Sequence, residues 1–348
     1  MDTNHNHQDD GNSSATKLIF ILSPAKTMNV TPMTRNQPIP WTKPSCDVSK
    51  TQELITIMKQ YSPSSLQKLL HISETLAMTA KQYWDQMTLG TSRSSDDNKD
   101  DDDSSSTSNH TTGKPCIFTF QGAAYQGLDI DTLLTTKSKH DDLAPLRYLQ
   151  ERLRIVDPLY GWLRPMDEIL PYRLEMATKN IPLVDRRGTT NDDDDDAGDK
   201  TKSKPRKKTK HDNKKNDKKS IKLHEYWKPS IQASIRNEGG TENVAKNNKE
   251  GEDEGTKSIV IINLASEEYS IAVDYTPRID IVFRHEGRVI GIHAKRARGL
   301  MVRYCAKNQI QNLSQLEQFA EEGYRYQPQQ SNATTMVFDR SKNWNTGK

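Results

Sequence analysis

Three stretches inside this chain are too polar to add to a hydrophobic core, and they divide its apolar residues into separate blocks. Segments with so few apolar residues and so many charges cannot repay the entropy that is lost when they order. A similar stretch precedes the first apolar block. We therefore expect one domain spanning residues 17–340, with a disordered tail at residues 1–16 and disordered inserts at residues 91–113, 187–219 and 237–257.

Charge is divided unevenly between these stretches and the rest of the chain. The 348 residues carry a formal net charge of +3, whereas the tail and the three inserts together carry −6, so the other 255 residues carry +9. A basic domain attracts polyanions such as nucleic acids, because each phosphate that it neutralises releases a counterion. The hidden basic charge therefore favours a polyanionic partner, although charge alone does not identify one.

Several classes of protein are disfavoured by the remaining composition. The three scattered cysteines form no C-x-x-C pair and indicate a reducing compartment, and no apolar run reaches the roughly 18 residues of a membrane span. The sequence has neither a zinc-ligand spacing nor a nucleotide-binding fingerprint. We expect a cytoplasmic protein without cofactor, metal or membrane partner. The Lys-rich run at residues 204–219 is either a nuclear localisation signal or a solvated loop.

Hydrophobic periodicity predicts both strands and helices. Short apolar or alternating runs predict strands at residues 18–22, 116–120, 259–264, 279–283, 288–293 and 336–338. Apolar residues at helical spacing predict helices within residues 52–87, 142–156 and 223–235. Together they predict an α+β fold of mixed topology in a single domain.

Two of the helices within residues 52–87 are separated by a very short break. Ser62-Pro63 and Ser73-Glu74 are both good helix starts, and only a few residues lie between the two helices. This is the layout of a helix-hairpin-helix, which offers backbone N–H groups to a DNA phosphate. Because the usual hairpin glycines are missing, this stretch by itself favours a plain helical hairpin that packs a core.

A group of cations lies where the predicted strand 288–293 meets a helical pattern. Lys295, Arg296 and Arg298 follow that strand at once, and free N–H groups at a helix start favour an anionic ligand. The group therefore predicts a phosphate contact. A solvated basic helix start is the alternative.

Further candidates lie at the end of the first strand and in an irregular loop. Lys26 follows the strand 18–22, and ligand-contacting groups are common at the carboxyl ends of strands in α/β sheets. Arg164 and Arg173 alternate with aromatic residues and prolines between residues 157 and 176, a pattern that can stack bases and bind phosphate. They can equally pair with nearby carboxylates, Glu175 or Asp167.

Taken together, the motifs resemble those of the YaaA family of peroxide-stress resistance proteins. The resemblance rests on Ser23-Pro24-Ala25-Lys26, the glycine-bounded turn at residues 122–128, and residues 159–165, 171–176, 263–269 and 294–301, in the order of the family. It implies a single α+β domain with a basic cleft and a helix-hairpin-helix element, DNA binding, and a role in limiting iron-driven oxidative damage. The sequence departs from the family at Ala123 and Ala124, where an acidic residue and a valine are usual.

The leading hypothesis is a monomeric DNA-binding protein of the hydrogen peroxide stress response. Binding to duplex or distorted DNA would be largely independent of sequence, since phosphate contacts position a duplex without reading its bases. The expected phosphate contacts are Lys26, Arg164, Arg173, Lys295, Arg296 and Arg298.

Two other functions remain open. The chain could be an enzyme acting on nucleic acid or on a phosphorylated small molecule, in which Lys26 is the nucleophile or proton carrier. Its acid partner would be Glu175 or Glu267, with Tyr160 or Tyr269 as a hydrogen-bond donor. Alternatively, the chain could be an interaction protein whose inserts recruit partners. We expect binding rather than catalysis.

Overall fold

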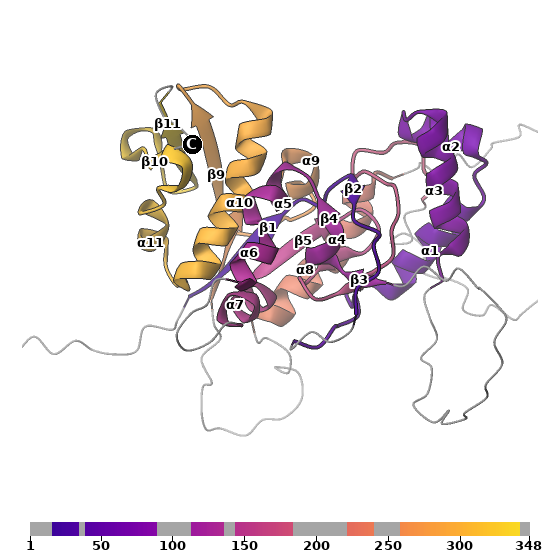
Figure 1. Cartoon of the computed structure of the whole chain (residues 1–348), viewed down its shortest axis with the longest axis horizontal. Helices are drawn as coiled ribbons and strands as arrows, with labels where there is room; N and C mark the ends of the chain where they lie inside the picture. The colour runs from indigo at the N-terminus through magenta and orange to yellow at the C-terminus, as the bar shows by residue number, and fades with distance from the viewer. Residues whose placement is uncertain are drawn as a thin grey trace, which may run out of the picture.

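The computed structural model describes residues 16–34, 39–88, 113–135, 143–183, 221–239 and 258–341. The expected insert at residues 187–219 lies outside these residues, as do residues 1–15 of the tail and most of the other two inserts. The disorder expected of those segments therefore stays a prediction. Within the described residues the chain forms a mixed α/β domain (Figure 1).

A seven-stranded mixed sheet forms the centre of the domain, and its strands are β1 (Lys17–Leu22), β5 (Leu153–Asp157), β6 (Gly161–Leu163), β8 (Ile259–Asn263), β9 (Arg278–His285), β10 (Arg325–Tyr326) and β11 (Thr335–Arg340). Their order is β10-β11-β9-β8-β1-β5-β6. The five inner strands are parallel, and the two edge strands run antiparallel to their neighbours. Almost every residue of β1 is buried, as its unbroken apolar run predicts for a strand covered on both faces.

Helices cover both faces of this sheet. Phe20 of β1 contacts Tyr148 of α7 (Ala144–Arg152), whereas Arg154 of β5 pairs with Glu238 of α8 (Leu223–Glu238). Phe20 is opposite Leu153 in the sheet, so Arg154 points to the other face. The helices α7 and α8 therefore lie on opposite faces of the sheet.

The remaining elements lie around the sheet and to either side of it. Helices α1, α2 and α3 stand on one side of the domain, and α11 lies on the other, near β9, β10 and β11 (Figure 1). The helices are α1 (Val48–Lys59), α2 (Pro63–Leu70), α3 (Glu74–Gln86), α4 (Cys116–Thr119), α5 (Ala123–Leu128), α6 (Ile130–Thr135), α9 (Glu267–Ser270), α10 (Gly291–Asn308) and α11 (Leu313–Glu317). Two short strand pairs join β2 (Thr27–Met28) to β4 (Phe120–Gln121) and β3 (Lys114–Pro115) to β7 (Glu168–Ile169).

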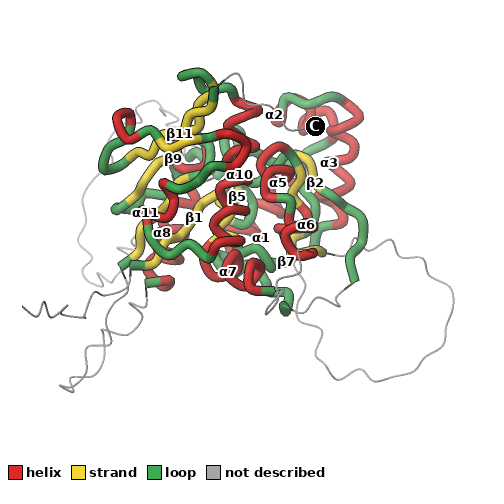
Figure 2. Tube along the Cα trace, turned by 60° about the vertical axis from the view of Figure 1, so that its left-hand side comes forward, coloured by secondary structure: helices red, strands yellow, loops and turns green. Residues whose placement is uncertain are grey.

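Helices α5 and α10 pack against each other unusually closely. They lie side by side in Figures 1 and 2. A Cβ atom on Gly299 would lie 1.7 Å from the backbone oxygen of Ala124, and one on Gly127 would lie 2.2 Å from the backbone oxygen of Arg296. Only glycine allows this approach, which fixes the start of α5 against the middle of α10.

The predicted helical hairpin is confirmed. Ser62 and Ser73 occupy the N-cap positions of α2 and α3, and each side chain accepts a hydrogen bond from a backbone N–H of the first turn. His71 ends α2 in the left-handed conformation, with a φ of 51°. Leu66 and Trp84 are buried, so the hairpin packs a core.

The strand predicted at residues 288–293 is wrong. After β9 the chain makes a tight turn through Glu286 and Gly287, both at positive φ, and α10 begins at Gly291. No sheet face covers the alternating apolar residues of this segment, since Val289 and Ile292 are 62% and 68% exposed. The cations of residues 295–298 therefore lie inside a helix rather than at a strand-to-helix junction.

Three further elements differ from the sequence-based prediction. The strand predicted at residues 116–120 is the short helix α4, flanked by β3 and β4, and the glycine-bounded turn at residues 122–128 is α5. The helix predicted at residues 142–156 ends at Arg152, where β5 begins. Helix α8 extends to Glu238, so the first two residues assigned to the third insert are helical.

Candidate functional site

A crevice opens where the chain leaves the sheet in two directions. Strand β1 has β5 on one side and β8 on the other. After β1 the chain goes on to β5, whereas after β8 it continues in the opposite direction to β9. Ligands in α/β sheets commonly bind at such a point, outside the carboxyl ends of the strands. A cavity of about 220 Å³ lies here, and we call it the switch-point cavity; it is lined by residues 22–27, 121–125, Leu264, Ser266, Glu268, Tyr269, Lys295 and Arg298.

Hydrogen bonds tie together the loops that form this cavity. The Ser266 N–H donates to the Ser23 hydroxyl at 2.9 Å, and the two hydroxyl oxygens are 3.2 Å apart. The Tyr125 hydroxyl donates to the backbone oxygen of Ser23 at 3.1 Å. Ser266 is the N-cap residue of α9, yet its side chain makes no capping hydrogen bond. It faces Ser23 instead, so the loops after β1 and β8 support each other.

Lys26 stands at the mouth of the cavity in a cluster with two other predicted residues. Its Nζ lies 2.6 Å from Glu175 Oε2, and Arg173 Nη2 lies 3.6 Å from Glu175 Oε1. Arg173 also donates a hydrogen bond to the backbone oxygen of Lys26 at 2.9 Å. Glu175 therefore partly neutralises both cations, and the three predicted residues form one cluster.

Lys295 and Arg298 of α10 line the cavity, and neither forms an ion pair with a carboxylate of the described residues. Among the described residues, neither side chain has a hydrogen bond or an ion pair. Burial lowers the pKa of the Arg298 guanidinium, because its charged form has lost part of its hydration. Arg298 is partly buried, so its charge gains most from an anionic partner, whereas the exposed Lys295 stays hydrated.

Two predicted cations lie elsewhere. Arg296 points away from the cavity and pairs with Glu322, with 2.7 Å between Arg296 Nη2 and Glu322 Oε1. Arg164 lies at the other end of the parallel strands, near their amino-terminal ends, beside a hollow that includes Lys17. It lies there because β6 runs antiparallel to β5 and carries the chain back. The structure thus brings Lys26, Arg173, Lys295 and Arg298 together and separates Arg164 and Arg296 from them.

The carboxylate in the cavity is Glu268, the neighbour of the predicted Glu267. Glu268 lines the cavity and Glu267 does not, although both side chains are exposed. Burial and the nearby Glu175 raise the pKa of Glu268, while Lys26 and Lys295 lower it. Sequence reasoning missed Glu268 because both glutamates fit the first turn of a helix equally well, and only the packing of α9 decides which one faces inward.

The two tyrosines considered as hydrogen-bond donors are also separated. Tyr269 is buried and lines the cavity, and burial raises its pKa. Tyr160 is buried outside the cavity, where its hydroxyl accepts a hydrogen bond from the Leu170 N–H at 3.1 Å. Each tyrosine thus has a backbone partner, Leu170 for Tyr160 and Met176 for Tyr269, and of the two only Tyr269 lines the cavity.

A second hollow, of about 520 Å³, begins on the other side of Lys26. We call it the hairpin groove, because it runs between the turn that joins α2 to α3 and the irregular loop after β7. It is lined by Lys26, residues 68–72, Arg173, Glu175 and residues 177–180. Lys68 and Lys179 are exposed in it and have no ion pair among the described residues. Four cations and one carboxylate thus face this groove.

Comparison with known proteins places the chain in a family. The model of the peroxide stress protein YaaA matches residues 18–188 and 206–330. The chain belongs to the YaaA peroxide stress protein family. It is 31% identical to a UPF0246 protein of Marinomonas sp. strain MWYL1, over 92% of this chain and 96% of that one. It is 32% identical to a UPF0246 protein of Francisella tularensis subsp. tularensis, over 93% of this chain and 100% of that one. The resemblance that the motifs indicate is therefore confirmed.

The two positions at which the resemblance implies a departure from the YaaA pattern fall in the switch-point cavity. Ala123 and Ala124, where the resemblance implies an acidic residue and a valine, both line it. Ala124 also contributes the backbone oxygen that approaches Gly299. The cavity in this YaaA-family chain therefore lacks a carboxylate at residue 123.

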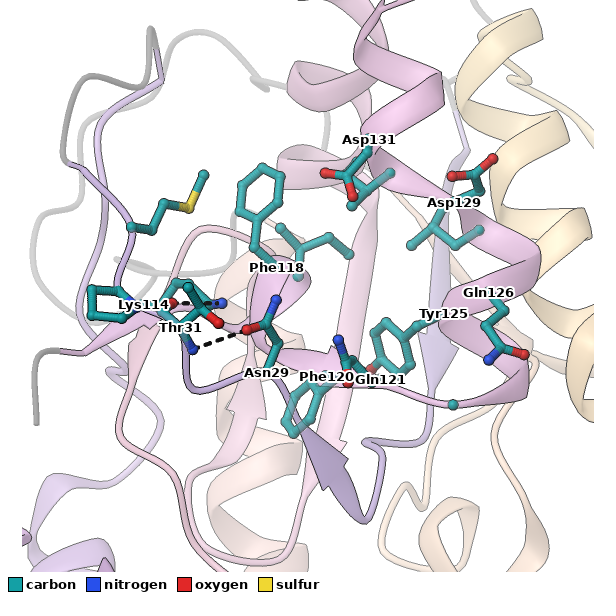
Figure 3. Close-up of a pocket in the computed structure, with 16 residues that line it drawn as sticks. Asn29, Thr31, Lys114, Phe118, Phe120, Gln121, Tyr125, Gln126, Asp129 and Asp131 are labelled. Carbon is teal, nitrogen blue, oxygen red and sulfur yellow. Dashed lines mark hydrogen bonds between the residues drawn. The ribbon is translucent and has the colours of Figure 1, made fainter.

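A third hollow, also of about 520 Å³, contains none of the predicted site residues (Figure 3). Lys114 is only 6% exposed there and donates a hydrogen bond to the backbone oxygen of Thr31 at 3.2 Å. Burial lowers the pKa of Lys114, and Asp131 raises it. Phe118 and Asp129 also border this hollow. No sequence motif distinguishes these residues from ordinary surface positions, so the sequence offered no signal for them.

Two features are absent from the described part of the chain. In that part, no group of three or more His, Cys, Asp or Glu side chains is arranged to hold a metal ion. Nor does any helix there have the length and apolar character required to cross a membrane.

Proposed function

We propose that this chain is a DNA-binding protein of the peroxide stress response, and that it holds duplex or distorted DNA in the hairpin groove by phosphate contacts. The observation that carries the proposal is the set of four cations in that groove, which are Lys26, Lys68, Arg173 and Lys179. Opposed only by Glu175, they leave an excess of positive charge beside an exposed helical turn. Such a surface binds phosphates largely independently of sequence.

The hairpin contributes to the proposal through its position as well as its charge. The turn after α2 borders the groove, so its backbone lies beside the cations of the loop at residues 173–180. A helix-hairpin-helix binds DNA through backbone N–H groups at such a turn. Here His71, rather than glycine, adopts the left-handed conformation that ends α2. The proposal therefore assigns phosphate binding mainly to the lysines and arginine.

Thiol chemistry is a poor explanation for a role in peroxide stress. Peroxide reacts with the thiolate form of cysteine, which requires a low pKa and exposure. Burial raises the pKa of Cys46 to about 11 and raises the pKa values of Cys116 and Cys305 well above their usual range. Binding that shields DNA from iron-driven damage is therefore the function that we propose.

The proposal is tested by removing the two unpaired lysines of the groove. Lys68→Ala/Lys179→Ala should weaken binding to a blunt duplex without terminal phosphates. The slope of log affinity against log salt should become shallower by about 1.8, because each lost phosphate contact removes about 0.9. Fluorescence anisotropy at several salt concentrations measures both quantities.

The matched control is Lys43→Ala/Lys307→Ala. It removes the same charge from two exposed lysines that line neither the groove nor the cavity. Binding and slope should stay close to those of the parent protein. If both double variants behave alike, the groove is not the DNA site.

An enzyme that uses the switch-point cavity is the second candidate, and Glu268 is the observation that favours it. A carboxyl with a raised pKa beside Lys26 and Tyr269 can transfer protons to a bound phosphorylated substrate. Nucleophilic attack by Lys26 would require its ion pair with Glu175 to open. Borohydride trapping on DNA containing abasic sites tests this role, and absence of an adduct at Lys26 counts against a lyase.

A further inference from the structure

We propose that the switch-point cavity binds a terminal phosphomonoester, as found at the end of a nucleic-acid strand or on a free mononucleotide. This site is distinct from the hairpin groove, where the proposed function places the bridging phosphates of a duplex. Binding of a strand end rests on that proposed function, whereas binding of a free mononucleotide does not.

The charges in the cavity match a dianion. Lys295 and Arg298 are three positions apart on α10, so they lie on the same face of the helix, and both line the cavity. Neither has a carboxylate partner among the described residues, in contrast to Lys26, Arg173 and Arg296. A phosphomonoester carries about −1.5 to −2 at pH 7, whereas a bridging phosphate in a nucleic-acid backbone carries a single charge.

The partial burial of Arg298 strengthens this assignment. A guanidinium that has lost hydration without gaining an ion pair destabilises the empty site, so an anion that enters the cavity relieves that cost. Arginine also binds phosphate through two parallel hydrogen bonds, a geometry that a phosphomonoester with three free oxygens accepts readily.

The shape of the cavity selects an end rather than the middle of a strand. It is concave, is lined by loops and helices from four parts of the chain, and measures about 220 Å³. Pockets for drug-sized ligands measure roughly 300–1,000 Å³, so this one suits a phosphate with its sugar. A bridging phosphate has a nucleotide on both sides and follows the convex surface of a duplex. A terminal phosphate can enter the cavity first.

Polar groups inside the cavity suit the same ligand. The hydroxyls of Ser23 and Ser266 lie 3.2 Å apart on the loops after β1 and β8 and can donate to phosphate oxygens. Glu268 also lines the cavity, and its carboxylate, when charged, repels an anionic ligand. Lys26 and Lys295 lie close enough to affect its pKa, so they offset its repulsion of the phosphate. Protonation of Glu268 would turn it into a further donor.

The experiment measures binding of the full chain to one single-stranded oligonucleotide prepared in three forms. These carry a 5′-phosphate, a 3′-phosphate or hydroxyls at both ends. At least one phosphorylated form should bind the parent protein about tenfold more tightly than the hydroxyl form, as expected for hydrogen bonds to charged groups. Equal affinity for all three forms would overturn the proposal.

Single variants locate the effect. Arg298→Ala should abolish the preference for the phosphorylated form, and Lys295→Ala, which changes an exposed side chain and leaves the fold intact, should reduce it severalfold. Lys307→Ala, at the far end of α10, should retain the preference. Persistence of the full preference in both Arg298→Ala and Lys295→Ala would overturn the assignment to this cavity.

Competition distinguishes the two sources of the phosphate. Displacement of the phosphorylated oligonucleotide by a deoxynucleoside monophosphate, but not by the nucleoside, supports a mononucleotide site. Failure of the monophosphate to compete, with the end preference intact, supports a strand-end site. Duplex binding through Lys68 and Lys179 is measured separately on DNA without terminal phosphates, so either proposal can fail while the other holds.

Discussion

At the scale of single residues, the sequence located the cations and one of their partners, Glu175, which was considered for both Lys26 and Arg173 and pairs with both. Lys26 follows a predicted strand, and Lys295 and Arg298 follow one another at helical spacing, so all three were accessible to sequence reasoning. The partner of Arg296 is Glu322, which meets α10 only in the folded chain. Pairing decides which cations remain available to a ligand, and it depends on contacts that spacing along the chain does not encode.

Asp157 is a residue that the sequence did not distinguish and that fixes the loop leading to Arg173. Its carboxylate is fully buried and accepts hydrogen bonds from the N–H groups of Leu159 and Tyr160, at 2.8 and 2.9 Å, and from the hydroxyl of Tyr172. These bonds favour the charged form, yet burial outweighs them and raises the pKa of Asp157 to about 6.

The raised pKa of Asp157 predicts a pH dependence of stability. An aspartate in the unfolded chain has a pKa of about 3.9, so between about pH 4 and pH 6 the folded protein binds more protons than the unfolded one. The contribution of Asp157 to the free energy of unfolding should therefore fall by about 3 kcal/mol as pH rises through this window. Urea unfolding of the parent and of Asp157→Asn at several pH values measures the difference.

Asp157→Asn should flatten that part of the pH profile, because asparagine does not ionise. Glu317→Gln, which changes an exposed carboxyl of α11, provides the control and should keep the profile of the parent protein. Parallel profiles for the parent and Asp157→Asn between pH 4 and pH 6 would show that Asp157 ionises normally in the folded chain.

At the scale of elements, regular strands and capped helices were predictable, and short or merged elements were not. β1, β8 and α8 follow from their apolar patterns, and α2 and α3 from their serine caps. The leucine spacing of residues 143–153 continues past the end of α7 into β5, so the boundary between helix and strand was hidden. α10 was mistaken for a strand at its start because Val289, Ile290 and Ile292 give a strand-like apolar pattern, although all three side chains are exposed.

The contact between α5 and α10 positions the cavity and depends on glycine. Gly299→Ala should destabilise the fold by about 1–3 kcal/mol or displace α5, because the added methyl group meets the backbone oxygen of Ala124. Gly291→Ala, on the same helix, has open space around the added methyl group and should be neutral or slightly stabilising. Thermal or urea unfolding of both variants tests the contact, which equal stabilities would contradict.

At the scale of the whole molecule, the sheet order creates a site that local patterns could not predict. The pairing of β1 with both β5 and β8 joins segments far apart in the chain and opens the crevice at the carboxyl ends of β1 and β8. Lys26 stands between that cavity and the hairpin groove. Family membership followed from the sequence motifs, but the division of the cations between two hollows required the fold.

DNA binding by the hairpin groove is tested most directly by the salt dependence of binding of the parent protein to a blunt duplex without terminal phosphates. Two unpaired lysines in the groove predict a slope of log affinity against log salt of about −2 or steeper. Two duplexes of unrelated sequence should bind with similar affinity, because the contacts are to phosphates. A slope near zero, or no binding at low salt, would contradict the central claim that the hairpin groove binds DNA.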